Sequence, residues 1–390
     1  MIMSLSESYL FVERDEQLRE VCARLAQAEW LTVDTEFLRE KTYYPQLCLV
    51  QIASASEVAC IDPLKVTSLD PLIALFANPN ILKIFHAARQ DMEMFWHSHR
   101  MLPAPLFDTQ VAAPLLGYSE QMGYATLVKE RLGIDIDKSE TRTDWSRRPL
   151  TNSQLDYAAA DVRHLAELFP KMRDELNQRG RLEWLTEDFA VLTDPATYEN
   201  PPEHAWKRLR GLQKFRGPAL ACAQALAAWR EQRAQQENRP RKWVLDDDAL
   251  MTLARIKASS VDDLRRIRGL QAPVVDRYGE QLIALLESAR QREPEPLPDY
   301  ERPMALSEDQ EAAVDVLLGV LRQLAARQDL NPTSIASRKD LQDLVRGERA
   351  HSPLLRGWRR GVAGEELLDV MEGRCRLQIK PTGLVVEPLN

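Results

Sequence analysis

Short runs of β-forming residues alternate with helical patterns from the N-terminus to about Leu192, as is typical of α/β domains. Four of these runs are predicted strands, at residues 30–37, 46–54, 57–61 and 82–85. The first three follow one another closely, so hairpin pairing is expected, and a helical pattern at residues 69–76 precedes the fourth. The sequence therefore predicts a mixed sheet flanked by helices.

The rest of the chain has mainly helical patterns, separated by turn-rich and proline-rich segments. Residues 193–202 contain three prolines and predict a linker. Residues 293–298 have proline at every second position, in the order Glu-Pro-Glu-Pro-Leu-Pro, and predict a stiff, extended linker. Residues 376–386 alternate enough to form a strand or a hairpin. The expected division is an α/β domain at 1–195, small all-α domains at 203–292 and 300–375, and a tail at 376–390.

The chain has 390 residues and a formal net charge of −8, which by itself disfavours a polyanionic partner. The charge is unevenly distributed. Residues 203–290 carry 17 Lys and Arg against 11 Asp and Glu, a local net charge of +6, so the remainder carries −14. This basic middle segment predicts a phosphate-binding face. A solvated helix surface rich in arginine is the alternative.

The five cysteines are scattered singly, without the paired spacing of a zinc site or a disulfide framework. Cys48 and Cys60 lie in apolar runs and are predicted core residues. The first residues lack a signal-peptide pattern, and no apolar run approaches the ~18 residues that span a membrane. A cytoplasmic protein without a membrane partner is expected, and no obligate protein partner is inferred.

Two acids stand at i and i+2 in a predicted strand. Asp34 and Glu36 share one face of that strand, because side chains alternate along it. Two carboxylates on one face repel each other unless a cation lies between them, and their oxygens suit Mg²⁺ or Mn²⁺. Two exposed acids on an edge strand are the alternative, although Val33 and Phe37 indicate that this strand is buried.

A third acid follows the strand at residues 82–85. Asp91 lies in an early turn of the helix that is predicted next, with Met94 and Phe95 at spacings that indicate burial. By itself, Asp91 is explained by the favourable dipole at a helix N-terminus. Asp108 is predicted to cap a helix rather than to bind metal.

Tyr157 and Asp161 lie four residues apart, on one face of a predicted helix that Asn152 or Ser153 can cap. The alanines at 158–160 allow this helix to pack closely on a sheet. A buried acid and phenol are costly without partners. A metal ion and a bound water would satisfy both groups.

Together these motifs resemble the DEDD exonucleases of ribonuclease H-like fold, in the tyrosine subclass and most closely the ribonuclease D family. The resemblance rests on Asp34 and Glu36 in a DxE strand, on the HAxxxD segment ending in Asp91, and on the YxxxD helix with Tyr157 and Asp161. Residues 144–150, Asp-Trp-Ser-Arg-Arg-Pro-Leu, also match this family. Farther along, the following residues resemble the HRDC domain: Leu226, Trp229, Arg230, Asn238, Arg239, Pro240, Val244, Asp248, Leu250, Tyr278 and Gly279.

The resemblance implies a metal-dependent 3′→5′ exoribonuclease that releases 5′-mononucleotides from RNA, with tRNA precursors bearing 3′ extensions as substrates. It implies two divalent ions, Mg²⁺ or Mn²⁺, held by Asp34, Glu36, Asp91 and Asp161, and a water oriented by Tyr157. It also places Thr35 and Phe37 near the terminal nucleotide. A second HRDC-like domain is implied at 300–375 by position alone.

The basic segment offers candidate contacts to RNA, although each is also explained as a solvated charge. The candidate phosphate ligands are Lys207, Arg208, Arg210, Lys214 and Arg216. Trp206, Phe215 and Trp243 could stack on bases, but core packing is predicted for all three. His164 lies three residues after Asp161 and could approach the acids, but a surface position on the helix is predicted.

Two other functions remain open on the residues alone. A 3′→5′ DNA exonuclease would use the same four acids, since none of the residues identified reads the 2′-hydroxyl. A non-catalytic nucleic-acid-binding protein could use the fold as a scaffold, but such a protein is expected to have lost at least one of the acids. Oligomeric state, metal preference and processivity are not predicted.

Overall fold

The computed structural model describes residues 8–137, 139–141, 143–297, 305–350, 352–381 and 383–389. The chain forms two compact units, each with its own hydrophobic core. The first comprises Met1–Glu36, Leu47–Thr197 and Met304–Asn390, and the second comprises Phe37–Gln46 and Tyr198–Pro303. None of the described helices is both long and apolar enough to cross a lipid bilayer.

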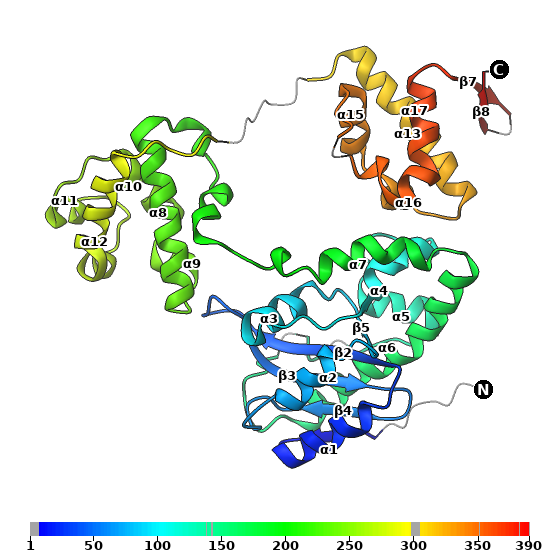
Figure 1. The fold of residues 1–390 in the computed structure, drawn as a ribbon, viewed down its shortest axis with the longest axis horizontal. Coiled ribbons are helices and arrows are strands. Elements are labelled where there is room, and N and C mark those ends of the chain that lie inside the picture. The colour runs from blue at the N-terminus through cyan, green and yellow to red at the C-terminus, as the bar shows by residue number, and fades with distance from the viewer. Residues whose placement is uncertain are drawn as a thin grey trace. The chain divides into compact units, whose positions relative to one another are not determined.

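Six strands form a mixed sheet in the order β1-β4-β3-β2-β5-β6 (Figure 1). β3 is antiparallel to β4, whereas β1 is parallel to β4, and β5 is parallel to both β2 and β6. The strands are Leu10–Val12 (β1), Trp30–Leu38 (β2), Gln46–Ala53 (β3), Val58–Ile61 (β4), Leu82–Phe85 (β5) and Leu106–Asp108 (β6).

This sheet confirms the predicted fold class and all four predicted strands, with bounds that differ by at most one residue. The two edge strands were not predicted. β1 and β6 contain three residues each, too few to show the alternation that marks a strand. Cys48 and Cys60 are fully buried, as predicted.

The helices of this part of the first unit flank the sheet (Figure 1). They are Asp15–Leu25 (α1), Asp70–Ala77 (α2), Arg89–His99 (α3), Thr109–Ala112 (α4), Tyr124–Leu132 (α5), Asn152–Gln178 (α6) and Thr186–Leu192 (α7), with 3-10 turns at Ala113–Leu116 (η1), Leu182–Leu185 (η2) and Pro195–Thr197 (η3). Met94 and Phe95 are buried on α3, as predicted.

The 27-residue helix α6 is capped by Thr151, so the predicted cap at Asn152 or Ser153 is wrong. The Thr151 hydroxyl accepts a hydrogen bond from the backbone N–H of Gln154 at 3.2 Å, and the Gln154 side chain accepts one from the backbone N–H of Thr151 at 2.9 Å. This reciprocal pair satisfies two donors that a helix start leaves unpaired, which a cap one residue later would not achieve.

The C-terminal part of the first unit is helical and ends in a hairpin. Its elements are Glu308–Arg327 (α13), Pro332–Ile335 (α14), Arg338–Arg346 (α15), Pro353–Leu355 (η6), Gly357–Arg359 (α16), Arg360–Gly364 (η7), Glu365–Met371 (α17), Cys375–Lys380 (β7) and Gly383–Pro388 (β8). The antiparallel pairing of β7 with β8 confirms the hairpin predicted for residues 376–386.

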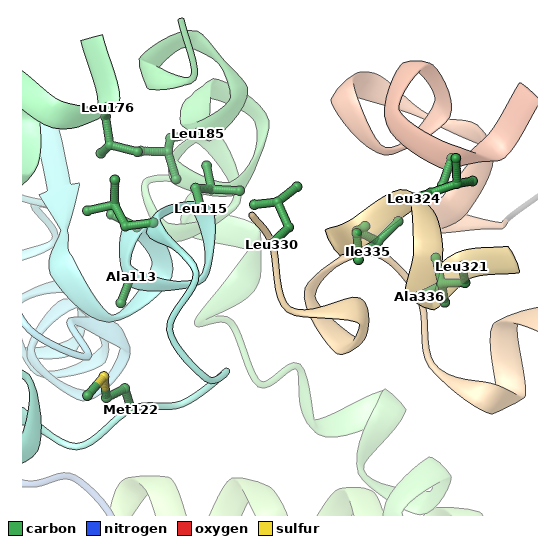
Figure 2. Close-up of a cluster of buried hydrophobic side chains, with 14 of the residues drawn as sticks. Ala113, Leu115, Met122, Leu176, Leu185, Leu321, Leu324, Leu330, Ile335 and Ala336 are labelled. Atoms are coloured by element: carbon green, nitrogen blue, oxygen red, sulfur yellow. The ribbon is translucent and has the colours of Figure 1, made fainter. Parts of the chain in front are cut away.

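This helical part shares a hydrophobic core with the sheet-containing part of the same unit (Figure 2). Leu330 lies close to Leu115 and Leu185. The buried guanidinium of Arg181 donates hydrogen bonds to the carbonyl of Leu115, at 2.7 Å, and to that of Gln328. Apolar burial and buried hydrogen bonds thus join two segments that lie far apart in the sequence.

The described residues of 206–290 in the second unit are helical without a strand, as predicted. The helices are Pro202–Arg208 (η4), Leu212–Lys214 (η5), Gly217–Gln236 (α8), Arg241–Val244 (α9), Asp247–Arg255 (α10), Val261–Arg265 (α11) and Ala272–Arg290 (α12). α8 packs against α10 and α12 (Figure 1), around Leu226, Leu250 and Leu282, which are fully buried. Tyr43, from the loop between β2 and β3, belongs to this core.

Candidate active site

Three of the predicted acids converge at the sheet. Asp34 and Glu36 leave β2 on the same face, and Asp161 comes from α6. The Thr32 hydroxyl of β2 donates a hydrogen bond of 2.8 Å to the carbonyl of Val162, which joins α6 to this strand. One oxygen from each carboxylate lies within 4.8 Å of the other two. The group therefore has the donor chemistry and spacing to hold a metal ion.

Asp91 lies in the first turn of α3 and is only 7% exposed. Its carboxylate accepts a hydrogen bond from the hydroxyl of Thr35. In the described part of the chain, Asp91 is not a member of the close carboxylate group. It acts on that group through its charge. Burial is the largest cause of the raised pKa of Glu36, and the charge of Asp91 adds to it.

The carboxylates are difficult to ionise together. Burial raises the pKa of Asp34 to about 6. Burial, and then the charges of Asp34, Asp161 and Asp91, raises the pKa of Glu36 to about 9. Burial and the charge of Asp34 also raise the pKa of Asp161. No described Lys or Arg forms an ion pair with Asp34, Glu36 or Asp161, so a bound cation is the natural way to offset the repulsion.

Tyr157 lies on the same face of α6 as Asp161. Burial, and then the charge of Asp161, raises the pKa of the phenol to about 12, so the hydroxyl stays protonated at neutral pH. The side chain of Thr141 forms a hydrogen bond with Tyr157. The Tyr157 ring lies 6.2 Å from the ring of Trp145, between centroids. These contacts hold a neutral hydrogen-bonding group beside the acids.

A cavity of about 450 Å³ opens over this group, within the range of about 300–1,000 Å³ of small-molecule sites. It is lined by Asp34, Thr35, Glu36, Tyr157 and Asp161 among the predicted residues. Phe37, predicted to lie near the terminal nucleotide, is not among the described residues that line it.

Several residues that line the cavity were not predicted. They are His86, Tyr124, Thr126, Asp137 and Thr141. His86 opens the HAxxxD segment that ends in Asp91, but that motif drew attention to the acid alone. No local motif indicates the other four, because each is brought to the cavity by contacts between distant segments.

Two of these unpredicted residues support the wall of the cavity. The Tyr124 hydroxyl donates a hydrogen bond to the backbone carbonyl of Asp161. His86 has Nδ1 3.0 Å from the hydroxyl of Thr109 and Nε2 3.0 Å from the carbonyl of Met122. Both nitrogens of His86 are therefore satisfied, and burial lowers the pKa of its ring.

The segment that precedes α6 is anchored by an arginine that pairs with a buried acid. Arg148 donates hydrogen bonds of 2.6 and 2.8 Å to the carboxylate of Asp62, which is fully buried. It also donates to the carbonyls of Cys48, at 2.6 Å, and Trp145, at 2.7 Å. Arg148 thereby fixes the position of Trp145, whose ring lies beside that of Tyr157.

Two other sequence predictions have different outcomes. Asp108 is confirmed as a helix cap, because its carboxylate accepts a hydrogen bond of 2.8 Å from the backbone N–H of Gln110. The surface position predicted for His164 is met only in part. His164 is partly exposed on α6, and burial lowers the pKa of its ring.

All five candidate phosphate contacts are exposed in the second unit. Arg208 also lies 3.5 Å from Glu231, and Arg216 donates two hydrogen bonds to nearby backbone carbonyls. These five residues are Lys207, Arg208, Arg210, Lys214 and Arg216.

The three aromatic residues considered for base stacking differ in their exposure. Trp206 and Phe215 are 3% and 2% exposed, so the predicted core packing is confirmed. Trp243 is 52% exposed, so the same prediction is wrong for this residue. The short helix α9 buries Val244 and leaves the preceding Trp243 on its solvent side.

The sequence matches two family models, 3′–5′ exonuclease over residues 9–177 and HRDC domain over residues 219–286. Ribonuclease D of Nitrobacter hamburgensis is 42% identical over 367 residues, which cover 93% of this chain and 95% of the relative. Ribonuclease D of Zymomonas mobilis is 40% identical, covering 93% of this chain and 94% of the relative.

Solved structures agree with these sequence matches. The crystal structure of Escherichia coli RNase D, described as an exoribonuclease involved in structured RNA processing, superposes with a TM-score of 0.81 and 30% identity, covering 94% of this chain and 99% of that one. The catalytic core of RRP6 from Trypanosoma brucei shares the fold, with a TM-score of 0.58 and 23% identity. Given the identity and coverage of these relatives, the chain belongs to the ribonuclease D family.

Proposed function

We propose that this chain is a 3′→5′ exoribonuclease that removes one nucleotide at a time from RNA and releases 5′-mononucleotides. The observation that carries this proposal is the close group of Asp34, Glu36 and Asp161, whose ligand oxygens lie within 4.8 Å in the cavity. The membership of the family supports RNA as the substrate.

Asp34, Glu36, Asp91 and Asp161 would hold two divalent ions, with Mg²⁺ or Mn²⁺ fitting their all-oxygen donor set. The raised pKa values of these acids support the fit, because a cation stabilises the carboxylates that burial and mutual repulsion destabilise. When bound, such ions polarise the phosphate and lower the pKa of the attacking water.

The chain's own residues position the attacking water and the acid group. Tyr157 offers a protonated hydroxyl that can hydrogen-bond the attacking water and orient it toward the phosphorus. A phenol with a pKa of about 12 does not accept that proton at neutral pH. Thr35 holds Asp91 through a hydrogen bond, so the loss of either residue would disturb the acid group.

We propose tRNA precursors with 3′ extensions as physiological substrates. The description of Escherichia coli RNase D as acting in structured RNA processing supports this class. In the second unit, Lys207, Arg208, Arg210, Lys214 and Arg216 would contact RNA phosphates, since all five are exposed within a segment of net charge +6.

The domain assignment is also a proposal. It comprises an exonuclease domain at 1–195, an HRDC domain at 203–292, a second HRDC-like domain at 300–375 and a tail at 376–390. The HRDC family match at residues 219–286 supports the second of these, and the helices of 308–371 are compatible with the third.

The deciding experiment is digestion of a 3′-extended tRNA by the full chain, with a DNA oligomer of the same sequence as the 3′ extension beside it. We expect mononucleotides to appear from the tRNA only when Mg²⁺ or Mn²⁺ is present, with Asp34→Ala and Asp161→Ala inactive but folded. Retained turnover in both variants would exclude this site. Faster hydrolysis of the DNA would instead identify a DNA exonuclease.

A further inference from the structure

A second cavity, of about 510 Å³, lies in the second unit. One wall comes from the loop that joins β2 to β3, with Arg39 and Tyr43. The opposite wall comes from α8 and α9, with Glu231, Lys242 and Trp243. The volume falls within the range of about 300–1,000 Å³ typical of small-ligand sites, so the cavity can receive a nucleotide.

The floor of this cavity is a neutralised carboxylate. Glu231 is 1% exposed, and Arg241 donates hydrogen bonds to both of its oxygens, one of them at 2.7 Å. The hydroxyl of Tyr43 donates to the same carboxylate, and the guanidinium of Arg241 lies 4.8 Å from the centroid of the Tyr43 ring. These bonds fix the shape of the cavity and cancel the charge of its deepest acid.

The remaining charge of the cavity is positive. Its lining contains five cationic side chains and three carboxylates, a net charge of +2. Asp247 is already engaged, with Arg230 at 2.7 Å and Lys242 at 3.7 Å. The side chain of Lys242 is 75% exposed, so its ammonium group can reach a phosphate without leaving a buried partner unpaired.

Trp243 also lines this cavity, and its ring is exposed to solvent. It is the one aromatic residue among the exposed large hydrophobic side chains of the described chain. Aromatic rings beside cationic side chains are the usual platform for single-stranded nucleic acid, because every base presents a stacking face and every nucleotide carries a phosphate.

We infer that this cavity binds one nucleotide of the RNA strand upstream of the 3′ end, with its base stacked on Trp243 and its phosphate near Lys242. The inference rests on the proposed function, since it assigns the strand held there to the RNA that is being shortened. It gives the second unit a defined subsite in addition to a diffuse basic surface.

Binding of a 20-nucleotide oligouridine to the full chain in EDTA tests the inference without hydrolysis. We expect Trp243→Ala to weaken binding at least about fivefold, because stacking of one base is worth that much or more, and Trp243→Phe to restore most of the loss. Lys242→Ala should weaken binding and reduce the salt slope by about 0.7. Ile256→Ala and Lys257→Ala, which change exposed residues of the same unit outside the cavity lining, are the matched controls.

Photocrosslinking locates the base directly. An oligouridine that carries 5-iodouracil should crosslink to the peptide that contains Trp243, and the crosslink should disappear in Trp243→Ala. Unchanged affinity in Trp243→Ala, or crosslinks confined to other peptides, would overturn the inference. Digestion of the 3′-extended tRNA in Mn²⁺ separates this result from a failure of the proposed function. A wild-type chain that releases no mononucleotides from that tRNA refutes the proposed function. A wild-type chain that digests the tRNA but binds oligouridine no more tightly than Trp243→Ala does refutes only the nucleotide-binding cavity.

Discussion

At the scale of single residues, Glu36 is a carboxylate in an environment that favours its neutral form. Burial, and then three neighbouring acids, raises its pKa to about 9. Glu36→Gln removes the charge and one proposed ligand oxygen. We therefore expect RNA hydrolysis to fall about 100-fold or more, while the free energy of unfolding in EDTA is not reduced.

Thermal unfolding with and without Mn²⁺ measures how much Glu36 contributes to metal binding, independently of turnover. The wild-type chain should gain stability with Mn²⁺, by about 2.7 kcal/mol at a hundredfold excess over the dissociation constant, and Glu36→Gln should lose most of that gain. Glu29→Gln, an exposed glutamate just before β2, should behave as wild type. A Glu36→Gln protein that keeps both its turnover and its response to Mn²⁺ would contradict the assignment.

Tyr157 is expected to act in the reaction more than in binding. Its hydroxyl is protonated at neutral pH because its pKa is about 12, raised chiefly by burial. Tyr157→Phe keeps the ring beside Trp145 and removes one positioned donor, so kcat should fall about 10- to 100-fold with little change in KM. Single-turnover kinetics on a short RNA would measure this. Tyr118→Phe, the same change outside the cavity lining, is the control, and equal rates for the two variants would remove the proposed role of Tyr157.

At the scale of elements, the segment before α6 offers two adjacent arginines with opposite surroundings. Arg148 pairs with the fully buried Asp62, whereas the side chain of Arg147 is 84% exposed beside Asp144. Arg148→Ala leaves a buried carboxylate without its partner and should reduce the free energy of unfolding by about 3–5 kcal/mol. Arg147→Ala should cost less than about 1 kcal/mol. Urea unfolding distinguishes these values. Similar losses of unfolding free energy in both variants would show that the pair of Arg148 with Asp62 adds no stability.

The loop between β2 and β3 is joined to α8 by a pH-sensitive contact. Burial alone would raise the pKa of Glu231, but hydrogen bonds from Arg241 and Tyr43 outweigh it, and the pKa is lowered from 4.5. A lowered pKa means that the native state binds the proton less readily than the unfolded state does. The stability contributed by the ionised group is therefore complete above pH 4.5 and is lost as the pH falls through the native pKa.

Glu231→Gln tests this contact. At pH 7 the variant should be less stable than wild type by about 1.5–3 kcal/mol, because Arg241 loses charge-assisted hydrogen bonds but is itself exposed enough to be solvated. Unfolding of both proteins followed by circular dichroism from pH 7 to pH 3 should show this difference shrinking below pH 4.5. Glu280→Gln, an exposed glutamate of the same unit, is the control. A difference that stays constant with pH would mean that the charge of Glu231 is not what stabilises the contact.

Elements with a strong local sequence pattern could be predicted. Elements and side-chain positions that depend on contacts with distant segments could not. The strand that carries Asp34 has nine residues and a clear apolar pattern, so the sequence predicts it, whereas β1 and β6 have only three residues each. The resemblance to a known family predicted that Asp161 would join that strand. No local pattern could indicate that Tyr124 supports Asp161 or that Trp243 is exposed, because both depend on contacts formed only in the folded chain.

At the scale of the whole molecule, the sheet-containing part of the first unit and its C-terminal helices share one hydrophobic core. The stacked rings of Trp184 and Trp358, 5.0 Å apart, join them, as does the ion pair of Arg179 with Asp329 at 2.8 Å. The C-terminal helices are therefore expected to be a structural part of the nuclease in addition to any role in binding RNA. A core that spans both segments should make them unfold together.

Leu330→Ala tests this cooperativity. Leu330 is 6% exposed and lies close to Leu115 and Leu185, so its truncation should reduce the free energy of unfolding by about 2–5 kcal/mol. If the core is shared, hydrogen exchange should accelerate in peptides around Leu115 and Leu185 as well as in α13 and α14. Val316→Ala, a 44% exposed position on α13, should leave exchange unchanged. Acceleration confined to the C-terminal helices would show that they unfold independently, because a core that loses a central side chain transmits the loss to every element packed against it.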